Sequence, residues 1–165
     1  MKKIIGLLSV FLTMISCTNA QQTAFKQEAL SNVMITTENE SITFQEILKK
    51  YEGQNIVIDV WASWCSDCIK GMPKVKALQE QFPGVTYLFI SMDKNNEAWT
   101  RGIAKYDVKG EHYLTSDGMK GVFGSSIDLD WIPRYMVVDR TGKIALFKVI
   151  EADDNKLIET LKSLK

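Results

Sequence analysis

The chain has 165 residues, of which 45% are hydrophobic and 24% are charged, a composition typical of a single globular domain. Its 3 prolines and 10 glycines argue against a disordered or fibrous chain. Lys and Arg total 20 and Asp and Glu total 20, so a net charge of zero gives no broad electrostatic footprint for nucleic acid. We therefore expect no nucleic-acid partner.

The first residues predict export. Lys2 and Lys3 precede a short apolar run, 4–12, in the order typical of a secretory signal peptide. This run is well short of the ~20 residues that a membrane-spanning helix needs. The segment from Met14 to Cys17 resembles the lipobox of bacterial lipoproteins, in which the cysteine is lipidated and becomes the mature N-terminus. Ordinary signal-peptidase cleavage after Ala20 is the alternative.

Lipidation of Cys17 accounts for the odd number of cysteines, because it leaves Cys65 and Cys68 as one pair. Disulfides persist outside the cytoplasm, so we expect a periplasmic or cell-envelope location. An acylated N-terminus would hold the protein at a membrane surface without spanning the membrane. The chain is expected to comprise a signal peptide of lipoprotein type, a tether of little order and one domain, at residues 1–16, 17–32 and 33–165.

Hydrophobic periodicity predicts alternating strands and helices in this domain. Residues 56–61 are apolar except for Asp59, as expected for a central strand covered on both faces. Thr43 and Glu46 have the spacing of a capping box, which predicts a helix from Thr43 to about residue 50. The other expected strands lie at 33–37, 85–90, 134–138 and 143–149. The other helices are expected from Cys65 to 82, over 95–106 and after 154, with 108–132 irregular except for a short helix near 118–123.

The segment Trp64-Cys65-Ser66-Asp67-Cys68 lies where the buried strand passes into a helix. A cysteine at a helix N-terminus faces free N–H groups and the positive end of the helix dipole, which favour its thiolate. Cys65 is therefore the expected nucleophile, and Cys68, one turn later, is expected to resolve the mixed disulfide. A structural disulfide or half of a zinc site are the alternatives. Zinc usually requires four ligands and His112 is the only histidine, so we expect no metal.

These residues resemble the thioredoxin fold, and specifically the exported, membrane-tethered TlpA/ResA-like thiol-disulfide oxidoreductases, over about residues 33–165. The matching elements are the segment 59–68, Pro73, and Trp131-Ile132-Pro133. The resemblance implies an α/β thioredoxin-like three-layer sandwich, in which a central mixed β-sheet is flanked by helices. It also implies an enzyme that exchanges disulfides with protein substrates, takes electrons from a membrane donor and needs no cofactor.

The resemblance also assigns roles to individual residues. Asp59 occupies the position of a buried acid beneath the disulfide, where burial raises its pKa and lets it exchange protons with Cys68. The alternative is an aspartate at a strand end paired with a lysine. Pro133 resembles the family's cis-proline, which leaves the backbone of Ile132 free to pair with an extended substrate, although it could be an ordinary strand-entry proline. Trp64 is expected to line the approach to the disulfide.

Ser66-Asp67 replaces the Gly-Pro type of dipeptide that is common in the family. The negative charge of Asp67 opposes ionisation of the Cys65 thiol, by roughly half to one pKa unit, and this predicts a reducing potential. The predicted function is therefore the reduction of protein disulfides outside the cytoplasm. The alternatives are a thiol peroxidase-like redoxin, or a non-enzymatic module whose cysteine pair stabilises the fold or binds a metal.

Overall fold

The computed structural model describes residues 21–165, which form one seven-stranded sheet with the strand order β2-β1-β5-β4-β3-β6-β7. The strands are β1 (Val33–Thr36), β2 (Ser41–Thr43), β3 (Ile56–Trp61), β4 (Thr86–Ser91), β5 (Glu111–Leu114), β6 (Arg134–Val138) and β7 (Ile144–Val149). The helices are α1 (Gln27–Leu30), α2 (Phe44–Lys50), α3 (Ser66–Gln81), α4 (Asn96–Tyr106), α5 (Val122–Ser126) and α6 (Asn155–Ser163).

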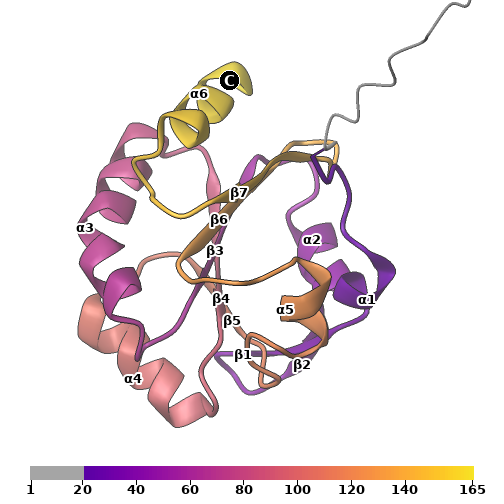
Figure 1. Cartoon of the computed structure of the whole chain (residues 1–165), viewed down its shortest axis with the longest axis vertical. Helices are drawn as coiled ribbons and strands as arrows, with labels where there is room; N and C mark the ends of the chain where they lie inside the picture. The colour runs from indigo at the N-terminus through magenta and orange to yellow at the C-terminus, as the bar shows by residue number, and fades with distance from the viewer. Residues whose placement is uncertain (1–20) are drawn as a thin grey trace, which may run out of the picture.

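The sheet is mixed, with β3 near its centre. Strand β3 pairs in parallel with β4 and antiparallel with β6, and all six of its residues are buried. Figure 1 shows the sheet on edge, with α3, α4 and α6 on one side and α1, α2 and α5 on the other. The predicted three-layer α/β arrangement with a mixed central sheet is therefore confirmed.

The predicted capping box at the start of α2 is present. The Thr43 hydroxyl accepts a hydrogen bond from the Glu46 N–H at 3.2 Å, and the Glu46 carboxylate accepts one from the Thr43 N–H at 2.8 Å. These bonds satisfy two backbone donors that a helix start leaves without partners. Local sequence thus fixes where the chain turns from β2 into α2.

Strand β5 corrects the expectation that residues 108–132 are irregular outside one short helix. It pairs in parallel with β4, and His112 lies opposite Phe89 in the register. The His112 ring stacks on the Phe89 ring, with centroids 5.2 Å apart, and its Nε2 lies 3.0 Å from the Val108 carbonyl oxygen. Four residues are too few for a periodic signal, and the pairing comes from a neighbour distant in sequence.

The expectation of little order before residue 33 is wrong for residues 21–32. Phe25 is buried and packs edge-to-face on Phe44, with ring centroids 4.9 Å apart, and Ala29 is fully buried in α1. The Thr23 carbonyl accepts a hydrogen bond from the Ile144 N–H at 2.9 Å. Two apolar side chains four residues apart and a hydrogen bond to β7 therefore hold an otherwise polar segment against the core.

The predicted signal peptide and the predicted lipidation site Cys17 lie outside the described residues. No helix within residues 21–165 is long and apolar enough to cross a membrane.

If residues 21–32 belong to the folded domain, Phe25→Ala will lower the free energy of unfolding by about 2–4 kcal/mol, because it removes a buried aromatic ring. Val122→Ala, an apolar truncation at an exposed position, is the control and should change it by less than about 1 kcal/mol. Urea unfolding of both variants makes the comparison. Equal effects would show that Phe25 does not contribute to the core.

Candidate active site

A short loop, residues 62–65, joins β3 to α3 and is fixed by a buried carboxylate. Ser63 donates to Asp93 twice, from its N–H to Oδ2 at 2.9 Å and from its hydroxyl to Oδ1 at 2.7 Å, and the Ser91 hydroxyl donates to Oδ2 at 2.7 Å. A Cβ at Gly102 of α4 would lie 2.5 Å from the Ser63 Cβ, so only glycine fits there. Asp93 was not predicted from the sequence, where its only local signal is a charged residue two positions after a buried strand.

The predicted cysteine pair forms a disulfide at the start of α3, with Cα atoms 5.3 Å apart. Cys65 is the N-cap, and its sulfur accepts a hydrogen bond from the Cys68 N–H at 3.1 Å. The two residues are unequally covered, because Cys65 is 6% exposed and Cys68 is 1% exposed. A donor at the helix N-terminus aimed at the Cys65 sulfur favours negative charge on that atom.

Asp59 is buried in β3, and desolvation raises the pKa of its carboxyl group to about 8. The hydroxyl of Tyr135, a neighbouring hydrogen-bonding group, lowers the pKa to a smaller extent. Within residues 21–165 the Oδ1 atom has no hydrogen-bond partner and no lysine forms a salt bridge with Asp59, contrary to the alternative of a lysine pair. A carboxyl group in this environment is neutral at pH 7 and titrates near neutrality.

The Ile132–Pro133 peptide bond is cis, as the resemblance implied, and it lies beside the disulfide. The carbonyl oxygen of Ile132 is 3.6 Å from the Cys65 sulfur. Trp64 and Trp131 are 58% and 55% exposed, respectively. A pocket of about 350 Å³ lies among these residues and is also lined by Ser66, Asp67, Met119 and Asp130. Cys65 therefore lines a largely apolar depression in the surface, whereas Cys68 does not.

A second pocket, of about 380 Å³, is also lined by Trp131 and Asp67. Its remaining lining residues come from α3, from the start of β6 and from the segment after β7: Lys70, Gly71, Lys74, Pro133, Tyr135, Ile150, Glu151 and Ala152. At this pocket, Lys74 forms salt bridges with Glu151 at 2.6 Å and with Asp153 at 3.1 Å.

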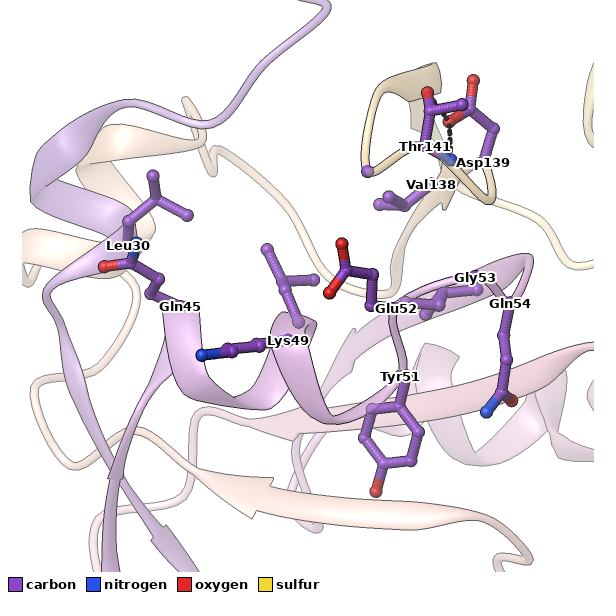
Figure 2. A pocket seen from close by; sticks show the side chains of 13 residues that line it. Leu30, Gln45, Lys49, Tyr51, Glu52, Gly53, Gln54, Val138, Asp139 and Thr141 are labelled. Carbon is purple, nitrogen blue, oxygen red and sulfur yellow. Dashed lines mark hydrogen bonds between the residues drawn. The ribbon is translucent and has the colours of Figure 1, made fainter.

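A third pocket, of about 360 Å³, lies at the opposite end of β3 from the disulfide. Ile56, the first residue of β3, and Val138, the last residue of β6, line it. Figure 2 shows Leu30 and Lys49 on one side of this pocket and the turn that carries Asp139 on the other. Neither cysteine of the pair lines this pocket.

Comparison with known proteins agrees with this geometry. Residues 53–144 match the thioredoxin-like family. The chain is 24% identical over 119 residues to the thiol-disulfide oxidoreductase ResA of Bacillus thuringiensis, which covers 71% of this chain and 67% of the relative. The resemblance predicted from the sequence is confirmed.

Solved structures share the fold. The thioredoxin domain of a thiol-disulfide oxidoreductase from Bacteroides vulgatus aligns with a TM-score of 0.67 at 24% identity, covering 86% of this chain and 99% of that chain. A thiol-disulfide oxidoreductase from Bacteroides fragilis aligns with a TM-score of 0.68 at 20% identity, and the alignment covers 81% of this chain and 96% of that chain.

The burial of Asp59 predicts a pH-dependent stability. Because the pKa is raised from 3.8 to about 8, the unfolded chain ionises first as the pH rises, so stability falls between about pH 4 and pH 8. Asp59→Asn removes this loss and should raise the free energy of unfolding at pH 8 by up to about 5 kcal/mol, with little change at pH 4.

Denaturant unfolding of the oxidised protein at pH 4, 6 and 8 measures the effect. Asp128→Asn, at an exposed carboxylate, is the matched control and should follow wild type. The same fall in stability with pH in Asp59→Asn as in wild type would contradict a neutral, buried Asp59.

Proposed function

The chain belongs to the thioredoxin-like family and is a thiol-disulfide oxidoreductase, and from this premise we propose that it reduces disulfides in protein substrates outside the cytoplasm. The arrangement of the cysteine pair carries the proposal. Cys65 caps α3 and lines the pocket that two exposed tryptophans also line, whereas Cys68 is 1% exposed and does not line this pocket. The Cys65 sulfur is therefore placed to react with a protein substrate, and the Cys68 sulfur is placed to release that substrate.

In the reduced protein, the Cys65 thiolate attacks one sulfur of the substrate disulfide. A bond forms between the two sulfurs, the substrate S–S bond breaks, and the second substrate sulfur leaves as a thiolate. The Cys68 N–H stabilises the attacking thiolate. The backbone of Ile132 is assigned to pairing with an extended substrate next to Pro133, and Trp64 to packing on it.

The mixed disulfide is then resolved by Cys68, which lies in the first turn of α3. Asp59 accepts the proton of the Cys68 thiol, and the resulting thiolate attacks the Cys65 sulfur. The mixed disulfide breaks, the substrate leaves as its second thiolate, and the Cys65–Cys68 disulfide forms. Two electrons have passed to the substrate. A donor at the membrane must then return two electrons to the pair, and the proton held by Asp59 goes back to Cys68, so that the Cys65 thiolate and the Cys68 thiol form again.

The N-terminal sequence supports the proposed location. The basic and apolar residues before residue 13 are those of a secretory signal, and lipidation at Cys17 would anchor the protein to a membrane surface. The direction of electron flow rests on Asp67 in the first turn of α3. Its carboxylate lies 3.7 Å from the Lys70 ammonium, and both groups are exposed, so the pairing offsets only part of its effect on Cys65.

The reduction potential of the pair tests the proposed direction. Equilibration of the protein against graded thiol-disulfide buffers is expected to give a value near or below that of thioredoxin, about −270 mV. A value near −120 mV would instead identify a disulfide donor. Failure of the pair to equilibrate would indicate a structural disulfide.

Trapping tests the roles of the two cysteines. Cys68→Ala is expected to accumulate mixed disulfides with protein substrates through Cys65, because nothing resolves them from within. Cys65→Ala is the matched control and should trap none, since Cys68 is almost fully buried. Non-reducing gels of cell-envelope fractions, followed by mass spectrometry, distinguish the two. Equal trapping by both variants would contradict the assignment of Cys65 as the nucleophile.

A further inference from the structure

Tyr135 lies directly opposite Asp59 in the antiparallel pair of β6 and β3. Residues opposite each other in a sheet have their side chains on the same face. On the other side of Asp59, the opposite residue of β4 is Phe89, which has no polar side-chain atom. Of the two residues that flank Asp59 in the sheet, only Tyr135 can therefore hydrogen-bond to its carboxyl group.

The Tyr135 side chain also reaches the pocket beside Trp131. It is buried and yet lines that pocket, together with Gly71 and Glu151. A Cβ at Gly71 of α3 would lie 3.9 Å from the Tyr135 hydroxyl oxygen, so this position of the helix leaves room beside that oxygen. Gly71 follows Cys68 by three residues, so both lie on the same face of α3. Because that face meets the Tyr135 hydroxyl, Cys68 lies on the side of the sheet that also carries Tyr135 and Asp59.

The charged groups around this pocket come from several elements. Asp59 faces the hydroxyl from β3, Lys74 belongs to α3, and Glu151 and Asp153 follow β7. Asp67 and Lys70 line the pocket from the first turn of α3. Burial and then the charge of Asp59 raise the pKa of Tyr135 well above its ordinary value. The hydroxyl therefore stays neutral, so it can both accept and donate a proton.

We infer that Tyr135 is a positioning residue whose hydroxyl carries protons between Asp59 and water in the pocket beside Gly71 and Glu151. The inference rests on the proposed function, in which Asp59 accepts the proton of Cys68. At neutral pH the Asp59 carboxyl group already holds a proton, which must leave first. That proton passes to the Tyr135 oxygen while the hydroxyl releases its own proton to water, and the carboxylate then takes the proton of Cys68. No electrons move in this exchange.

Tyr135→Phe tests the inference because it removes one oxygen atom and keeps the ring. Tyr87→Phe is the matched control, since Tyr87 is also buried against α3 and donates its hydroxyl to the Leu78 carbonyl at 3.0 Å. The reduced full chain is mixed with glutathione disulfide and quenched at intervals from pH 5 to pH 10. Mass spectrometry then counts the mixed disulfide and the internal disulfide.

In wild type and Tyr87→Phe, the rate of resolution should rise with pH around a midpoint near the Asp59 pKa of about 8. In Tyr135→Phe the midpoint should shift upward by about one unit, so resolution at pH 7 slows about tenfold while formation of the mixed disulfide is unchanged. The double variant Asp59→Asn, Tyr135→Phe should resolve the mixed disulfide no more slowly than Asp59→Asn alone. Superimposable profiles for Tyr135→Phe and Tyr87→Phe would overturn the inference.

Gly71→Ala gives a second, independent test. The methyl group occupies space beside the Tyr135 hydroxyl at ordinary contact distance, and alanine strengthens a helix interior. The variant should therefore unfold at a higher urea concentration and yet resolve the mixed disulfide more slowly at pH 7. Resolution as fast as in wild type would overturn the proposed exit for protons.

The two proposals fail in different ways. If wild type forms no mixed disulfide with glutathione disulfide and none with protein substrates, the proposed function is wrong. If wild type exchanges and Asp59→Asn is slow, but Tyr135→Phe and Gly71→Ala both behave as wild type, only the role of Tyr135 is wrong.

Discussion

Cys65 caps α3 with its own sulfur, and the hydrogen bond from the Cys68 N–H to that sulfur ties the start of the helix to the disulfide. The strand before it is buried along its whole length, so the chain reaches the surface only where β3 ends. The helix then turns Cys68 back toward the sheet face that carries Asp59. The sulfur that lines the pocket, the sulfur behind it and the buried acid are thus placed by one strand-to-helix connection.

Two buried carboxylates near this connection have opposite environments. Asp93 accepts hydrogen bonds from the N–H and hydroxyl of Ser63 and from the hydroxyl of Ser91, which hold the loop before Cys65 in place. Asp59 keeps an oxygen without a partner among residues 21–165, and its desolvation, which raises the pKa, outweighs the opposing effect of the Tyr135 hydroxyl. Hydrogen bonds compensate a buried carboxylate, and their lack leaves the group ready to titrate. Asp93 therefore holds the loop before Cys65 in place, whereas Asp59 is a buried group that gains or loses a proton near neutral pH.

Local signals predicted much of this arrangement. The apolar run of β3, the capping box at Thr43 and the cysteine spacing are each contained within a few residues, and the structure has the corresponding elements. Strand β5 and the packing of Phe25 depend on partners far away in the chain, so no local pattern indicates them. Tyr135 was missed for the same reason. Only the register of β6 on β3 shows that it faces Asp59.

Trp131 and Asp67 line both the pocket that contains Cys65 and the pocket that contains Tyr135, so these two residues lie between the two pockets. One pocket contains Trp64, Cys65 and Ile132, where the proposed substrate segment pairs with the chain. The other contains Tyr135 and opens among charged side chains of α3 and of the segment after β7. A substrate bound to the first pocket would leave the second in contact with water. Because resolution takes place while the substrate is still attached to Cys65, protons need a route that the substrate does not cover, and the two-pocket arrangement supplies one.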